Sequence, residues 1–253
     1  MQLSKRMQHL TFLITEGNRL ADVGTDHGYV PIALVRDKRI PSAIAMDVNR
    51  GPLARAGKHI QESGLSTYIE TRLSDGLAKL GPEEADTVLI AGMGGMLTRR
   101  ILKEGGHCLH TVKELVLQPQ SDIHRVREWL CENGYQITAE DMVEEDGKYY
   151  PMMRAVHGQE RKLSQTELYY GKGEIQRAPE VLHSCLQAEL SRSRRLLEIL
   201  RQNGQEGTRR AAEVAESIRR ISSCCKEAAH CPASEQSAGQ QIMNRRMFPD
   251  EMQ

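Results

Sequence analysis

Acidic residues and glycines stand together in one short segment at spacings that suit the binding of a nucleotide-type cofactor. Residues 19–31 read Arg-Leu-Ala-Asp-Val-Gly-Thr-Asp-His-Gly-Tyr-Val-Pro. The apolar run predicts a buried strand that ends near Asp22, and Pro31 suits the first turn of a helix. Gly24 and Gly28 let the backbone between them turn tightly and approach a ligand. A strand, a glycine loop and a helix in this order are typical of a cofactor-binding loop.

The composition of this loop indicates which kind of cofactor it holds. A dinucleotide is usually bound by Gly-x-Gly-x-x-Gly, whereas this loop carries Asp26 and His27 between its glycines. A carboxylate at that place would repel an anionic pyrophosphate. S-adenosylmethionine (SAM) has a positive sulfonium and an ammonium group instead. The loop therefore favours a SAM-dependent methyltransferase.

Further polar residues follow the next predicted strands. Asp47 comes 25 residues after Asp22 (47 − 22), close to the spacing at which a carboxylate accepts hydrogen bonds from ribose hydroxyls. The alternative role of Asp47, at the end of its strand, is to cap the N-terminus of the helix that follows. Asp75, followed by Gly76, suits the amino group of adenine, and its alternative is an ordinary Asp-Gly turn. In a doubly wound sheet these positions meet at one edge, where ligands bind.

The elements that must position these residues are short apolar strands alternating with helical patterns. Five strands are predicted at 19–23, 43–47, 68–73, 86–91 and 114–118, a rhythm typical of βαβ units. Two more, at 135–142 and 148–157, flank an Asp-Gly turn and predict a hairpin. We expect a Rossmann-like, doubly wound class I methyltransferase sheet of seven strands with the last one antiparallel. This α/β domain would span residues 1–160.

Helical periodicity dominates the rest of the chain. Leucines recur at helical spacing before the turn at 202–207, and a second apolar set follows it, so residues 161–230 predict an antiparallel, coiled-coil-like helical hairpin. The polar segment 231–253 predicts a flexible tail. The chain has no net charge, but residues 1–160 carry 19 basic and 22 acidic side chains, and 161–230 carry 13 and 9. The arm is therefore basic, and its arginine pairs suit phosphates or a solvated helix face equally well: Arg194, Arg195, Arg209 and Arg210.

Other features of the composition exclude several classes of protein. No apolar run is long enough to cross a membrane, so the sequence predicts a soluble, cytoplasmic protein. The six cysteines show neither metal-ligand nor disulfide-domain spacing, and no carboxylate–histidine cluster suggests a metal. The sequence gives no sign of an obligate protein partner.

Four segments together resemble a known family. Ala-Asp-Val-Gly-Thr-Asp-His-Gly-Tyr-Val-Pro at 21–31, Ala-Met-Asp-Val-Asn at 45–49, Ser-Asp-Gly at 74–76 and Ala-Gly-Met-Gly-Gly at 91–95 are similar to the bacterial tRNA (adenine(22)-N1)-methyltransferases, TrmK. The resemblance covers roughly residues 1–230. It implies a SAM-binding Rossmann-like domain, a coiled-coil-like arm, and methylation of an adenine in the D-arm region of tRNA.

The resemblance also implies roles for particular residues. Asp47 would hold the ribose of SAM, and Asp75 with Gly76 would hold its adenine. The floor of the transfer site would be Ala91 to Gly94, which includes Gly92 and Met93. The residues implied around the methionine end are Asp22, Gly24, Asp26, His27 and Gly28.

The segment 91–95 lacks the Asn/Asp-Pro-Pro-Tyr/Phe motif of many enzymes that methylate the exocyclic amine of adenine. N1 of adenine has an in-plane lone pair, so its methylation needs positioning rather than a base. We expect backbone groups of the glycine loop to contact the base edge, Tyr29 to stack on the flipped base and Asp26 to stabilise its charge. Arg99 and Arg100 would meet tRNA phosphates or solvate a helix. The alternatives are a methyltransferase of another substrate and a non-catalytic RNA-binding protein that keeps the fold.

Overall fold

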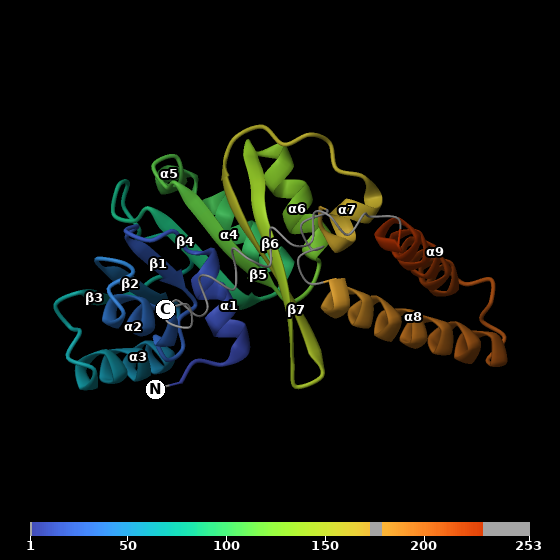
Figure 1. Cartoon of the computed structure of the whole chain (residues 1–253), viewed down its shortest axis with the longest axis horizontal. Coiled ribbons are helices and arrows are strands. Elements are labelled where there is room, and N and C mark those ends of the chain that lie inside the picture. The colour runs from blue at the N-terminus through green and yellow to red at the C-terminus, as the bar shows by residue number, and fades with distance from the viewer. Residues whose placement is uncertain (1, 173–178, 230–253) are drawn as a thin grey trace, which may run out of the picture. The chain divides into compact units, whose positions relative to one another are not determined.

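The computed structural model describes residues 2–172 and 179–229, so the tail predicted at 231–253 lies outside the described residues (Figure 1). Clustering of contacts divides the chain into two compact units, with the boundary between Lys162 and Leu163. Unit 1 holds a sheet with its helices, and unit 2 is helical. Each unit is described separately below.

One seven-stranded sheet of order β3-β2-β1-β4-β5-β7-β6 forms the centre of unit 1. The first five strands are parallel to one another, and β7 runs antiparallel to both β5 and β6. This arrangement confirms the predicted class I sheet with a terminal hairpin. The strands are β1 (Leu20–Val23), β2 (Ala43–Asp47), β3 (Ile69–Leu73), β4 (Thr87–Met93), β5 (Glu114–Pro119), β6 (Tyr135–Glu145) and β7 (Lys148–His157).

The order of the strands reverses at β1, which lies between β2 on one side and β4 on the other. At such a switch point the connections leave in opposite directions, and a crevice opens beyond the carboxyl ends of the two strands. The loop after β1 is tied to β2, because the amides of Gly24 and Thr25 both donate to the carbonyl of Met46, at 2.8 and 2.9 Å. The fold therefore places the acidic loop directly at the crevice.

Helices cover this sheet, and α1 has a particular place among them. The side chain of Ser4 caps α1 by accepting a hydrogen bond from the Met7 amide. Leu10 and Leu13 of α1 are buried in the same core as Val116 of β5 and Met152 of β7. The helices of unit 1 are α1 (Lys5–Leu13), α2 (Tyr29–Arg36), α3 (Arg50–Glu62), α4 (Gly95–Glu104), α5 (Gly106–Leu109) and α6 (Ile123–Glu132).

Unit 2 contains the predicted helical hairpin. α8 (Pro179–Gln202) and α9 (Arg209–Ala229) are joined by a short turn, and Leu200 packs against Ala211 and Val214 in a small apolar cluster. A short helix that the sequence analysis did not predict, α7 (Gln165–Tyr170), packs on α9. It begins with a capping box, in which Ser164 and Glu167 bond each other's backbone amides.

An ion cluster fixes the point where the chain enters β1 and β4. The carboxylate of Asp86 accepts from the Arg19 backbone amide at 2.9 Å and from Arg19 Nε at 2.8 Å, and Lys113 Nζ lies 3.1 Å away. The Arg19 side chain, backed by Lys113, holds the pKa of Asp86 well below its ordinary value of 3.8. Because Asp86 is buried, its ion pairs stabilise the folded chain and do not merely balance charge at the surface.

This cluster predicts a pH-dependent loss of stability in Asp86→Asn. A carboxylate whose pKa is lower in the folded chain stabilises the fold above its unfolded pKa and loses that contribution as the pH falls toward its folded pKa. We expect the substitution to lower the free energy of unfolding by about 2–3 kcal/mol at pH 7 and by clearly less at pH 3, measured by urea denaturation. The exposed Asp37→Asn is the control. An equal or larger loss at pH 3 would contradict the assignment.

Candidate active site

The loop after β1 forms one wall of a pocket of about 300 Å³. Gly24 and Gly28 have φ values of 81° and 68°, in the region that favours glycine, and Gly28 begins α2. A Cβ atom on Gly24 would lie 2.1 Å from Cε of Met93, the end of a flexible side chain, so the positive φ is the stronger reason for glycine at this position. The lining residues come from α1, the loop, β4 and the segment after β5: Arg6, Met7, Leu10, Asp22, Gly24, Thr25, Asp26, His27, Gly28, Tyr29, Val30, Leu89, Ala91, Gly92 and Gln120.

Asp22 is the buried acid of this pocket, with 8% of its surface exposed. Burial raises its pKa from 3.8 to about 6, and the charge of Asp47 on the neighbouring strand adds to the rise. A carboxylate in such a place is stabilised by a positive ligand more than by water. The pocket therefore suits a cationic group next to Asp22.

Asp26, in contrast, is more than half exposed and is paired within the protein. It forms an ion pair with the guanidinium of Arg55 on α3, and Nε2 of His27 lies 3.3 Å from its second carboxylate oxygen. Arg55 was not predicted, because helix α2, strand β2 and the first turn of α3 separate it from the loop in the sequence. Much of the negative charge expected at Asp26 is consequently balanced before any ligand arrives.

Three rings lie nearly parallel beside this loop. The ring centroids of His27 and Tyr29 are 4.9 Å apart, and His59 of α3 lies 5.3 and 5.4 Å from them. The interplanar angles are between 15° and 18°. Nδ1 of His27 is buried and finds no hydrogen-bond partner among the residues that the structure describes. The three rings are stacked on one another, and His27 and Tyr29 also line the pocket, whereas His59 was not predicted as part of this cluster.

A buried amide links the glycine loop to α1. The side chain of Gln118 is 1% exposed, and its Oε1 accepts from the Gly92 amide at 3.2 Å and from Arg6 Nη1 at 3.0 Å. The Arg6 guanidinium also lies 5.2 Å from the ring centroid of Tyr150. Within the described parts of the chain no carboxylate pairs with this guanidinium. Arg6, which the sequence analysis missed, brings a full positive charge to the pocket.

The structure does not place every predicted site residue in this pocket. Asp47 and Asp75 lie at the ends of the adjacent strands β2 and β3, outside its lining. Oδ1 of Asp47 accepts from the Asn49 amide at 2.6 Å, and Asp75 pairs with Arg100 Nη2 at 3.1 Å. The other two predicted residues outside the lining are Gly76, after β3, and Met93, against Gly24. Asp47, Asp75 and Gly76 lie along the sheet edge at β2 and β3, and Met93 is on β4.

The arginines predicted to bind RNA lie on three helices. Arg100 on α4 is engaged with Asp75, and Nη1 of Arg99 lies 3.8 Å from the sulfur of Met96. Arg194 and Arg195 on α8 and Arg209 and Arg210 on α9 are exposed. The last two share one carboxylate, that of Glu213, at 2.9 and 3.5 Å.

In residues 2–172 and 179–229 no group of three or more His, Cys, Asp or Glu side chains is arranged to hold a metal ion. None of the helices described is long and apolar enough to span a bilayer.

Comparisons with known proteins agree with this geometry. Residues 3–153, more than half of the chain, match the family described as a methyltransferase domain. The tRNA (adenine(22)-N(1))-methyltransferase of Bacillus subtilis (strain 168) is 39% identical over 158 residues, which are 62% of this chain and 66% of that relative.

Two solved structures extend the likeness over the arm. Streptococcus pneumoniae Sp1610, solved in complex with S-adenosyl-L-methionine, is 35% identical with a TM-score of 0.80, and the match covers 90% of this chain and 100% of that one. The m1A22 tRNA methyltransferase TrmK of B. subtilis is 30% identical with a TM-score of 0.76, covering 88% of this chain and 98% of that one.

The switch-point pocket and the matched domain together define the class, which is that of the Rossmann-like methyltransferases. Within that class, the chain belongs to the tRNA (adenine(22)-N(1))-methyltransferase family, TrmK. The resemblance found in the sequence is thereby confirmed.

The buried acid predicts that Asp22→Asn stabilises the free chain at neutral pH. A carboxylate whose pKa is raised in the folded chain favours folding below its unfolded pKa, and this preference is lost as the pH rises through about 6. Ionised Asp22 therefore costs on the order of 2–3 kcal/mol at pH 7, a cost that asparagine avoids. We expect a higher free energy of unfolding at pH 7 and no gain at pH 4, in urea titrations beside the exposed control Glu62→Gln. A destabilised variant at pH 7 would contradict this.

Proposed function

We propose that this chain transfers the methyl group of SAM to N1 of adenine 22 in tRNA. Membership of the family supports the reaction, and the observation that carries it is the pocket lined both by buried Asp22 and by Arg6, whose guanidinium pairs with no carboxylate among the described residues. The chemistry of those two groups identifies the kind of ligand that the pocket accepts.

The methionine end of SAM fits this pocket by its charges. It carries an ammonium and a carboxylate on one carbon, and the pocket is lined by the buried carboxylate of Asp22, by that of Asp26, which pairs with Arg55, and by one guanidinium, that of Arg6. Gly24 and Gly28 have no side chains, so the backbone can approach the ligand at these two positions. Asp22 would bind the ammonium and Arg6 the carboxylate, each by charge-assisted hydrogen bonds.

The nucleoside end of SAM would extend along the sheet edge. Asp47 at the end of β2 would accept from the ribose hydroxyls, and Asp75 with Gly76 after β3 would hold the adenine. The ion pair between Asp75 and Arg100 is exposed, at 54% and 49%, so its opening costs little. Opening it would free Asp75 for the cofactor and Arg100 for a tRNA phosphate.

Bound SAM supplies an electrophilic methyl group, and the protein supplies position and the exclusion of water. The N1 lone pair of adenine needs no base, so the residues around it need only hold the base in line with that methyl group. Because the Gly92 amide is already bonded to Gln118, Gly92 would serve by leaving space for the base rather than by donating to it. Ala91 and Met93 would complete the floor beside it.

The target base would be held by rings and side chains at the mouth of the pocket. Tyr29, stacked with His27 and His59, offers an aromatic face to a flipped adenine. Asp26 would stabilise the positive charge of the methylated base, although Arg55 weakens that effect. Phosphates of the tRNA would be bound by Arg99 and by the exposed arginines of the arm: Arg194, Arg195, Arg209 and Arg210.

Incubation of the purified chain with unmodified tRNA transcripts and methyl-labelled SAM tests the proposal. We expect label in 1-methyladenosine after digestion of the tRNA to nucleosides. Label in another nucleoside would contradict the choice of N1, and no label in any adenine-22 transcript would contradict the proposed function.

Arg6→Gln is predicted to weaken SAM binding while leaving the fold intact. The substitution removes a charge-assisted hydrogen bond worth about 1.5–3 kcal/mol, so the dissociation constant should rise roughly 10- to 150-fold in calorimetry. Arg36→Gln is the matched control, because Arg36 lies on α2 and pairs with Asp37 at the surface. Equal affinities of the Arg6 variant and the control would remove Arg6 from the cofactor site.

A further inference from the structure

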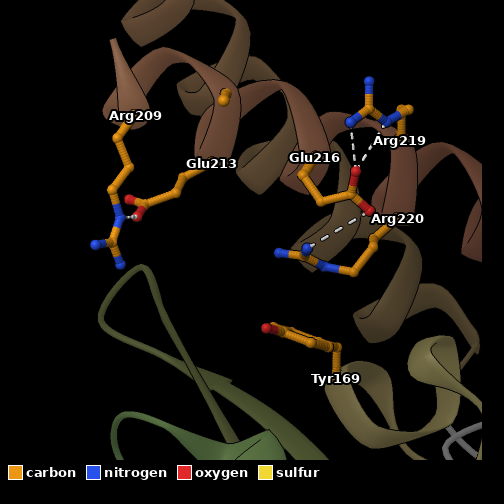
Figure 2. Close-up of a pocket in the computed structure, with 7 residues that line it drawn as sticks. Tyr169, Arg209, Glu213, Glu216, Arg219 and Arg220 are labelled. Atoms are coloured by element: carbon orange, nitrogen blue, oxygen red, sulfur yellow. Dashed lines mark hydrogen bonds and ion pairs between the residues drawn. The ribbon is translucent and has the colours of Figure 1, made fainter.

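A groove in unit 2 is lined by one aromatic ring and three arginines (Figure 2). Its volume is about 630 Å³. Tyr169 of α7 forms one side, and the other side is formed by α9, with Arg209, Glu213, Arg219 and Arg220 among its side chains. The groove takes no part in the methyl-transfer pocket.

The groove lies on a face of α9 that the helical hairpin does not use. Residues 209, 213, 216 and 220 follow one another at steps of four, three and four, which places them on one side of the helix. Ala211, Val214 and Ile218 belong to the apolar cluster that packs on α8. The groove face is therefore available to a ligand without any change in the hairpin.

A cation–π contact forms the centre of the groove. The Arg220 guanidinium lies over the Tyr169 ring, 4.1 Å from its centroid, and Figure 2 shows its plane above the ring. Its Nη1 lies 3.9 Å from Glu216, while its Nε is buried and has no hydrogen-bond partner within the described ranges. A planar cation with unmet donors and an aromatic ring beneath it is a stacking surface for a nucleobase.

The charges of this face favour an anion. Four arginines share two carboxylates, since Arg209 and Arg210 pair with Glu213, and Arg219 and Arg220 pair with Glu216. Of these six residues Arg210 does not line the groove, so the lining holds three arginines, two glutamates and an excess of one positive charge. Ion pairs on an exposed helix contribute little to stability, so their arginines can turn to a phosphate at small cost.

We propose that this groove binds an unpaired nucleotide of tRNA other than the methylated adenine. The base stacks on the Arg220–Tyr169 pair, and Arg209 and Arg219 bind phosphates of the single-stranded stretch that contains this nucleotide. These two arginines are ten residues apart, about 15 Å along a helix, which suits phosphates of a short stretch of single strand. The inference rests on the proposed function, because it takes tRNA as the substrate.

Binding of a fluorescent unmodified tRNA to the full chain at several salt concentrations tests this groove. Stacking on an aromatic ring predicts about 5- to 100-fold weaker binding for Tyr169→Ala and near wild-type binding for Tyr169→Phe, which keeps the ring. Arg209→Gln and Arg219→Gln should each lower the slope of log affinity against log salt by about 0.7–0.9, as expected for one lost phosphate contact. Affinity for SAM should stay unchanged in all four variants.

Arg201→Gln is the matched control, since Arg201 is an exposed arginine of α8 that pairs with Glu198 and Glu206. Wild-type tRNA affinity in Tyr169→Ala, or slopes for the groove variants equal to that of the control, would overturn the inference. Stronger competition by polyglutamate than by single-stranded RNA would assign the groove to an acidic protein and overturn it as well.

Two further readouts separate the possible failures. If circular dichroism shows that Tyr169→Ala loses helix, a photoreactive benzoylphenylalanine at position 169 replaces it. A crosslink to tRNA then supports the groove, and its absence overturns it. If the wild-type chain neither binds nor methylates tRNA, the proposed function itself is wrong. If the wild-type chain methylates tRNA and the groove variants bind tRNA as tightly as the wild type, the proposed function stands and only the groove inference is wrong.

Discussion

Burial of the Asp22 carboxylate at the end of β1 is the constraint on which the site depends. The strand order places β1 between β2 and β4, so the carboxylate is covered by neighbouring strands and the loop that follows. An ionised acid in such a place destabilises the free chain, as its raised pKa shows. A cationic ligand removes that cost when it binds, and a positively charged methyl donor is such a ligand. The ionised Asp22 carboxylate lowers the stability of the free chain, and the site keeps it because binding of a cationic ligand needs its negative charge.

The positive side of the pocket comes from a different part of the fold. α1 lies in the same core as β5 and β7, and its burial through Leu10 and Leu13 brings Arg6 to the glycine loop. Gln118 fixes both partners, because one oxygen accepts from Arg6 and from the Gly92 amide. The helix before the sheet is thus part of the site, and the pocket is complete only when the first helix and the first, fourth and fifth strands are assembled.

Much of the architecture could be predicted from local patterns. All seven strands were expected within a few residues of their observed limits. The buried parallel strands β1, β2, β4 and β5 are largely apolar runs, whereas the more polar edge strand β3 was expected from the βαβ rhythm and the β6–β7 hairpin from its Asp-Gly turn. The hairpin arm followed from helical periodicity in the same way. Asp22, Gly24, Gly28 and Gly92 line the pocket, as expected for residues that directly follow the strands of a doubly wound sheet.

Contacts between distant segments could not be predicted in this way. Arg55 balances Asp26, and His59 stacks on His27, because α3 packs beside the first loop, which no spacing in the sequence reveals. Arg6 reaches Gln118 across 112 positions of the chain. The pairing of Asp75 with Arg100 joins a predicted cofactor ligand to a predicted RNA ligand. Only the capping box at Ser164, which marks α7, was a local signal open to detection.

Primer extension along a tRNA treated with this chain and SAM tests the central claim most directly. A methyl group at N1 blocks Watson–Crick pairing, so reverse transcriptase should stop one nucleotide before adenine 22, only when both the chain and SAM are present. The stop should vanish in a transcript with guanine at position 22. Full-length extension of the treated adenine-22 tRNA, or a stop at another position that persists with guanine 22, would contradict the account.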